Sequence, residues 1–172
     1  MAFGSLAEGN IGGGGGGIFL DEGTTVNLTN CTLSLNAADF GDGGGIYAYG
    51  SAFYPGHAIL NLTNSIVAGN TYTDIYGPVT TADHNLVGDA YDSSGVVNGV
   101  NGNIVGGNGN PVINADLGPL QNNGGPTQTM ALLRGSPAIG QADNSQAPAT
   151  DQRGVLRLDA AGETTDIGAF ER

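Results

Sequence analysis

Two aspartates lie close together just before a glycine run, in the order Asp39-Phe40-Gly41-Asp42. Glycoside hydrolysis uses a pair of carboxyl groups, one as general acid and the other as base or nucleophile. Asp39 and Asp42 are therefore the candidate catalytic residues if the chain is an enzyme. The alternative is that aspartates beside glycine are solvated turn formers with no chemical role.

Aromatic residues and a histidine follow these aspartates along the chain. They are Tyr47, Tyr49, Tyr54 and His57. Aromatic rings beside carboxylates suit carbohydrate, so we expect these four side chains to bind a substrate or ligand. A uronate lyase is less favoured than a hydrolase, because the chain has no lysine and its four arginines all lie at residue 134 or later.

Metal-binding patterns are absent from the sequence. His57 and His84 are the only histidines, Cys31 is the only cysteine, and no pair of them has the spacing of a zinc motif. We therefore predict no metal site and interpret His84 as a loop histidine with a backbone partner. The formal net charge of −12 is compatible with bound Ca²⁺, although solubility alone explains an acidic surface.

A repeat organises the first half of the chain. The glycine run and apolar residue at Gly15–Ile18 return 28 residues later at Gly43–Ile46, and the phrase at residues 26–30 returns at 60–64. Short apolar segments separated by Gly or Asn corners, three to each repeat, predict an all-β fold, a right-handed parallel β-helix. In that fold one repeat stacks on the next.

The repeat also predicts which residues lie above one another. Ile18 should stack on Ile46, Leu28 on Leu62, and Leu33 on Val67 or Ile66. Asparagines at equivalent corners should form amide ladders. The expected pairs are Asn27 with Asn61, Asn30 with Asn64, and Asn36 with Asn70.

The C-terminal part of the chain has a different sequence pattern. We expect β-helix coils over residues 1–110 and, over 111–172, an irregular segment that packs on them within one structural domain. Ala131-Leu132-Leu133 is the one stretch there that suits a helical turn. Asp151, Arg153 and Asp166 suggest a bidentate arginine–carboxylate contact that fastens this segment.

Four phrases in this part carry a resemblance to a known family. They span residues 117–129, 132–140, 150–154 and 166–171, and include Gly135-Ser136-Pro137-Ala138. Together they resemble the C-terminal region of bacterial choice-of-anchor Q domain proteins, which have right-handed parallel β-helix repeats. The resemblance implies an extracellular or cell-surface location. Because the chain starts inside a coil, we expect it to be a terminal piece of such a protein, able to self-associate through an open N-terminal coil.

Charge and hydropathy limit the classes of function that the chain can have. An acidic chain without basic clusters does not suit nucleic acid or anionic membranes, and no apolar stretch is long enough to span a bilayer. We expect a structural or adhesion module that contacts glycans or another cell-surface ligand. The alternative is a carbohydrate-active enzyme, either a glycoside hydrolase or a polysaccharide lyase, so the sequence leaves enzymatic activity open.

Overall fold

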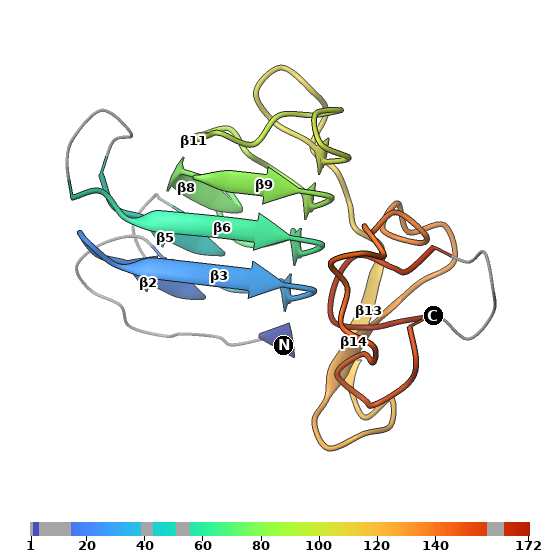
Figure 1. Cartoon of the computed structure of the whole chain (residues 1–172). Coiled ribbons are helices and arrows are strands. Elements are labelled where there is room, and N and C mark those ends of the chain that lie inside the picture. Colours follow the sequence, from blue (N-terminus) through green and yellow to red (C-terminus); the bar gives the residue numbers. More distant parts are fainter. Residues whose placement is uncertain (1, 4–14, 39–42, 51–55, 158–163) are drawn as a thin grey trace.

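The computed structural model describes residues 2–3, 15–38, 43–50, 56–157 and 164–172. Every regular element in these ranges is a β-strand (Figure 1). The strands are β1 (Ala2–Phe3), β2 (Ile18–Leu20), β3 (Thr25–Thr29), β4 (Thr32–Leu33), β5 (Ile46–Ala48), β6 (Ile59–Thr63), β7 (Ile66–Val67), β8 (Ile75–Pro78), β9 (Thr81–Asp83), β10 (Leu86–Val87), β11 (Ser93–Ser94), β12 (Ile104–Val105), β13 (Leu117–Gln121) and β14 (Thr129–Leu132).

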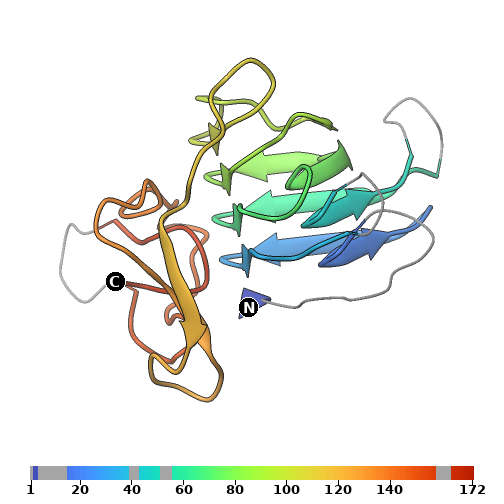
Figure 2. The same ribbon diagram turned by 180° about the vertical axis from the view of Figure 1, so that it is seen from behind.

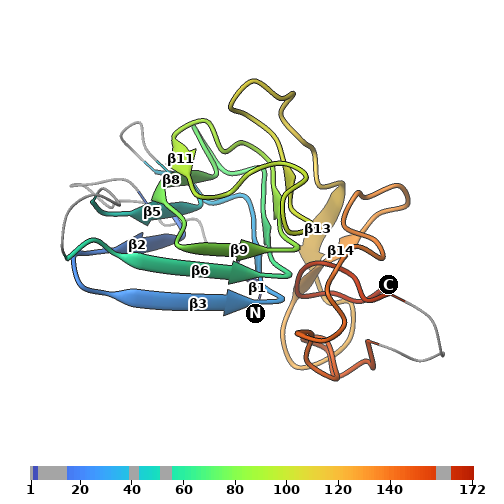
Figure 3. The ribbon, with the colours of Figure 1, turned by 45° about the horizontal axis from the view of Figure 1, so that its top comes forward.

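Strands β1 to β12 form three parallel sheets that the chain visits in rotation (Figure 3). We call them sheet A (β1-β4-β7-β10-β12), sheet B (β2-β5-β8-β11) and sheet C (β3-β6-β9). From β2 to β10, each strand enters a different sheet from the one before it, and every third strand returns to the same sheet beside its predecessor. The predicted all-β class and repeated stacking are therefore present.

The predicted register is confirmed. Ile18 pairs with Ile46, Leu28 with Leu62, and Leu33 with Val67. Parallel pairing in register places like residues above one another, so the apolar residues form continuous columns. The columns that point inward form one core shared by the three sheets, with Leu20, Leu60 and Val87 among its buried members.

The three predicted asparagine ladders are also present. Amide side chains bond across repeats from Asn61 to Asn27 at 2.7 Å, from Asn64 to Asn30 at 3.4 Å, and from Asn36 to Asn70 at 2.9 Å. Asn85 and Asn103 form a further ladder contact at 3.0 Å, and Asn85 is completely buried. Buried amides of this kind satisfy backbone groups at corners where no strand partner is available.

One corner has the same left-handed backbone in successive repeats. Asn30 and Asn64 have φ of 48° and His84 has φ of 49°, and Gly102 takes the next position with φ of 68°. We call these four residues the corner column. Asparagine, histidine and glycine all adopt this region of backbone space more readily than most residues do, and His84 is the one member of the column with an imidazole.

The C-terminal segment packs on the outward side of sheet A (Figures 1 and 2). Ile66 and Leu86 point away from the first core and pack in a second core that includes Ile167 and Phe170. The approach is close at Gly168, where a Cβ atom would lie 2.7 Å from Ile66 Cδ1. The segment therefore covers one sheet face that the repeats leave apolar.

The expected helical turn at Ala131–Leu133 is wrong. Thr129–Leu132 is strand β14, which pairs antiparallel with β13. A short apolar run suits either structure by periodicity alone, and here the partner strand β13 supplies the hydrogen bonds that decide between them. The segment is thus a β-hairpin followed by irregular chain.

The N-terminal end of the stack is less open than expected, because sheet A has one more strand there. β1 pairs with β4, with Ala2 beside Thr32, so sheet A continues beyond the first full repeat. Within the described ranges, β2 and β3 are the edge strands of sheets B and C. Self-association through this end stays a prediction, and it now concerns the edges of β2 and β3.

The buried ladder should matter more to stability than the exposed one. The Asn85 side chain accepts a hydrogen bond from the Ser65 N–H and donates one to the Leu62 carbonyl. Asn85→Ala therefore removes a hydrogen-bond partner from two buried backbone groups. We expect it to lower the free energy of unfolding by about 2–4 kcal/mol, measured by chemical denaturation. Asn27→Ala, in the exposed ladder, is the control and should cost about 1 kcal/mol or less. Equal losses in the two variants would contradict this assignment.

Candidate functional site

Three aromatic rings form a column on the outward face of sheet B. Phe19, Tyr47 and Tyr76 occupy paired positions on β2, β5 and β8. The ring centroids of Phe19 and Tyr47 are 5.2 Å apart and those of Tyr47 and Tyr76 are 4.8 Å apart, with planes within 13° of parallel. We call these residues the aromatic column. Tyr47 lies between the other two rings, so it presents its edge, while Phe19 is 43% exposed.

The predicted ligand residues partly converge beside this column. Tyr49 directly follows β5, and its carbonyl accepts a hydrogen bond from Ala58 N–H, the residue after His57. A Cβ atom on Gly50 would lie 3.0 Å from His57 Cβ, so the backbone near Tyr49 and His57 is closely apposed. The chain around Tyr49 and His57 therefore comes together just beyond the end of β5, two residues from Tyr47.

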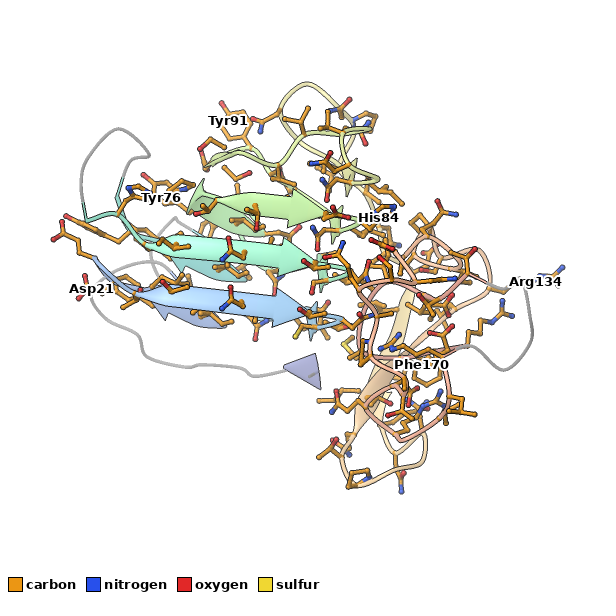
Figure 4. All side chains as sticks on the ribbon, in the orientation of Figure 1. Asp21, Tyr76, His84, Tyr91, Arg134 and Phe170 are labelled. Atoms are coloured by element: carbon orange, nitrogen blue, oxygen red, sulfur yellow. The ribbon has the colours of Figure 1, made fainter. Side chains whose placement is uncertain are left out.

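Asp39, Asp42 and Tyr54 lie outside the described residues. The corner after β2 does have an exposed acidic residue, Asp21, whose carboxylate accepts from its neighbour's N–H at 2.8 Å (Figure 4). That contact is the turn-forming role expected for an acidic corner residue.

The predicted arginine contact in the C-terminal segment is half correct. The Arg153 guanidinium contacts the Asp151 carboxylate at 2.7 Å and also covers the Phe170 ring at 3.6 Å from its centroid. Asp166 is not its second partner. The Asp166 carboxylate instead accepts backbone N–H groups of Gly140 and Arg172, at 2.7 and 2.9 Å.

A second ion pair in this segment was not anticipated. The buried Arg157 guanidinium contacts the Glu171 carboxylate at 2.9 Å and donates to the backbone carbonyls of Asp166 and Gly168. Burial raises the pKa of Glu171 to about 7, against the opposing effect of Arg157. Because Arg157 and Glu171 are occupied by each other and by backbone groups, this pair holds the segment together.

Asp74 is the most deeply buried carboxyl group among the described residues of the repeats. Its Oδ1 accepts from the Asn70 backbone and side-chain amides at 2.9 and 2.8 Å, and its Oδ2 accepts from Asp89 N–H. Burial raises the pKa of Asp74 to about 6, although these hydrogen bonds oppose the rise. Asp74 thus continues the Asn36–Asn70 ladder and holds the next repeat.

Potential metal ligands meet where the repeats contact the C-terminal segment. Asp83, His84 and Asp143 each offer a ligand atom, and these atoms lie within 4.8 Å of one another. The His84 Nδ1 lies 2.5 Å from the Asp83 carboxylate, and the backbone N–H of His84 donates to the Asn101 carbonyl at 2.8 Å. Hydrogen bonds from Gln146 and Ser145 hold the pKa of Asp143 below its usual range. Asp143 is remote in sequence, so no local motif revealed the group.

No family model matches this chain, and neither a curated protein nor a solved structure is significantly similar to it. No helix that is long and apolar enough to cross a bilayer occurs in the described part of the chain.

The raised pKa values of Asp74 and Glu171 make stability depend on pH. Each group binds its proton more tightly in the folded chain, so the free energy of unfolding should fall as the pH rises from 3.8 to about 7. Chemical denaturation across this range measures the effect. Asp74→Asn should flatten the curve between 3.8 and about 6. Stability that increases with pH over this interval would contradict the assignment.

Proposed function

We propose that the three sheets form a right-handed parallel β-helix and that the chain is a non-catalytic structural and adhesion module at the cell surface. Connections between parallel strands of one sheet are almost always right-handed, which supports the hand. The rotation of the chain through sheets A, B and C supports the β-helix. Contact with carbohydrate through sheet B is the binding activity that we propose for it.

The aromatic column is the observation that carries this proposal. Outward positions of a solvated sheet face usually carry polar side chains, whereas sheet B has three aromatic residues in line. Phe19 and the neighbouring Tyr49 are 43% and 42% exposed. A sugar ring has an apolar face of C–H groups and a rim of hydroxyl groups. An exposed aromatic surface with hydroxyl groups at its edge can contact the apolar face and form hydrogen bonds with the rim.

Charge favours neutral glycans as the ligands. The chain has a formal net charge of −12, so an anionic polysaccharide would be repelled. Arg153 and Arg157 are engaged in ion pairs within the C-terminal segment, away from sheet B. Electrostatics therefore supports a neutral polysaccharide over a uronate or a sulfated chain.

The enzyme alternative has less support. Among the described carboxyl groups, Asp74, Asp151, Asp166 and Glu171 accept hydrogen bonds from backbone amides of their own surroundings. A hydrolase needs two carboxyl groups facing one bond of the substrate. Asp39 and Asp42 are the predicted pair for this alternative, and both lie outside the described residues.

Binding to a panel of neutral polysaccharides tests the adhesion proposal. We expect retention of the wild-type chain in affinity electrophoresis with at least one member of the panel. Tyr47→Ala removes the central ring and should weaken that retention by about tenfold. Tyr91→Ala is the matched control, because Tyr91 is 69% exposed and lies outside the aromatic column. Failure to bind any member, or equal loss in both variants, would contradict the proposal.

A hydrolysis assay separates the two functions. We expect the wild-type chain to release no reducing ends from the polysaccharide that it binds. Asp39→Ala and Asp42→Ala should bind that polysaccharide as the wild type does. Release of reducing ends that either substitution abolishes would establish the enzyme in place of the adhesion module.

A further inference from the structure

The geometry points to a binding site for a divalent transition-metal ion of the zinc class, formed by Asp83, His84 and Asp143 at the contact between the repeats and the C-terminal segment. Figure 4 shows His84 at this boundary, beyond the end of β9. The inference does not depend on the proposed carbohydrate contact, because sheet B contributes none of the three residues.

The set of donor groups selects the kind of metal. The site combines one imidazole with two carboxylates, and their ligand atoms already lie within 4.8 Å of one another. Imidazole suits Zn²⁺, Ni²⁺ and Cu²⁺, whereas Ca²⁺ and Mg²⁺ prefer sites made only of oxygen. Three protein ligands leave a position for water, and two carboxylates balance the charge of a divalent ion. A zinc-class ion fits these donors better than Ca²⁺ does.

His84 occupies a position where the two preceding repeats have asparagine. Asn30 and Asn64 precede it in the corner column with nearly the same φ, so the corner itself does not require histidine. The next member, Gly102, accommodates the imidazole, because a Cβ atom there would lie 2.4 Å from His84 Cδ2. The side chains of Asn30 and Asn64 bond the C-terminal segment, and His84 brings a metal ligand to that same boundary.

Asp143 is held in place from both sides. Its backbone N–H donates to Asn64 Oδ1 at 2.8 Å, and its carbonyl accepts from Asn64 Nδ2 at 2.9 Å. Its carboxylate accepts from Ser145 and from Gln146 at 2.8 Å. Such outer contacts fix the orientation of a metal ligand before the ion arrives. The double contact with Asn64 therefore positions Asp143 opposite the repeat that carries His84.

The Asp83 carboxylate completes the set of ligands beside the imidazole. Its Oδ1 lies 2.5 Å from His84 Nδ1. Metal ligands must lose their protons to bind, so the ion takes the place of the proton between these two atoms. All three side chains are partly exposed, so an ion can reach them from solvent. A bound ion would join residues 83–84 to residue 143 and so fasten the C-terminal segment to the repeats.

Titration of metal-free protein with ZnCl₂ tests this inference. Isothermal calorimetry at neutral pH should show one ion bound per chain, and Zn²⁺ should raise Tm. His84→Asn introduces the residue found in the two preceding corners, so it should fold while binding Zn²⁺ at least about tenfold more weakly. Asp143→Asn should weaken binding to a similar degree. His57→Asn removes the other histidine and should bind Zn²⁺ as the wild type does.

Several results would overturn the inference. They are the absence of saturable Zn²⁺ binding, wild-type affinity in His84→Asn, loss of binding in His57→Asn, and a preference for CaCl₂ over ZnCl₂ in parallel titrations. Circular dichroism and denaturation of each variant without metal show whether it folds. If His84→Asn does not fold, Asp83→Asn and Asp143→Asn decide the outcome through the same titration. None of these readouts involves polysaccharide, so failure of the adhesion proposal leaves them unaffected.

Discussion

In-register parallel pairing between successive repeats is the constraint on which the rest of this structure depends. It places each residue against its equivalent in the next repeat, so one apolar residue becomes a column and one asparagine becomes a ladder. Glycines at the tight corners are required by the same constraint. A Cβ atom on Gly44 would lie 2.1 Å from the Thr71 carbonyl oxygen of the following repeat. Loops between the strands vary in length without disturbing this register.

The corner column connects this stack to the C-terminal segment. Asn30 donates to the carbonyls of Asp166 and Gly168, and Asn64 exchanges two hydrogen bonds with Asp143. The apolar outward residues of sheet A pack against the same segment. The C-terminal segment therefore contacts equivalent residues of successive repeats, although its own sequence has no repeat. Its internal ion pairs hold it in the shape that fits this surface.

Much of the repeat region was predictable from the sequence because its rules are local and periodic. The spacing of the glycine runs and of the Asn-Leu-Thr-Asn phrase fixed the partners of Ile18, Leu28 and Asn27. Only one member of the aromatic column, Tyr47, was identified from the sequence. Its neighbours Phe19 and Tyr76 were not. Both follow from the same register, one repeat below and one repeat above.

The C-terminal segment was much less predictable, because its contacts join residues with no periodic relation. Arg157 meets Glu171, and Asp143 meets His84, through folding of irregular chain that carries no spacing signal. The apolar run ending at Leu132 suited a helix until its partner strand was known. A lone histidine likewise gave no indication of a metal ligand, since its companions come from another part of the chain.

Native-state hydrogen exchange tests the central claim, that the stack and the C-terminal segment form one cooperative unit held by the corner column. Backbone amides of β6 and β7 and those of Ile167 and Gly168, which donate to Ala138 and Asn64, should exchange through the same global opening. We expect equal free energies of exchange that fall together with added denaturant. Exchange of the C-terminal amides at a much lower free energy, while β6 and β7 stay protected, would contradict the account.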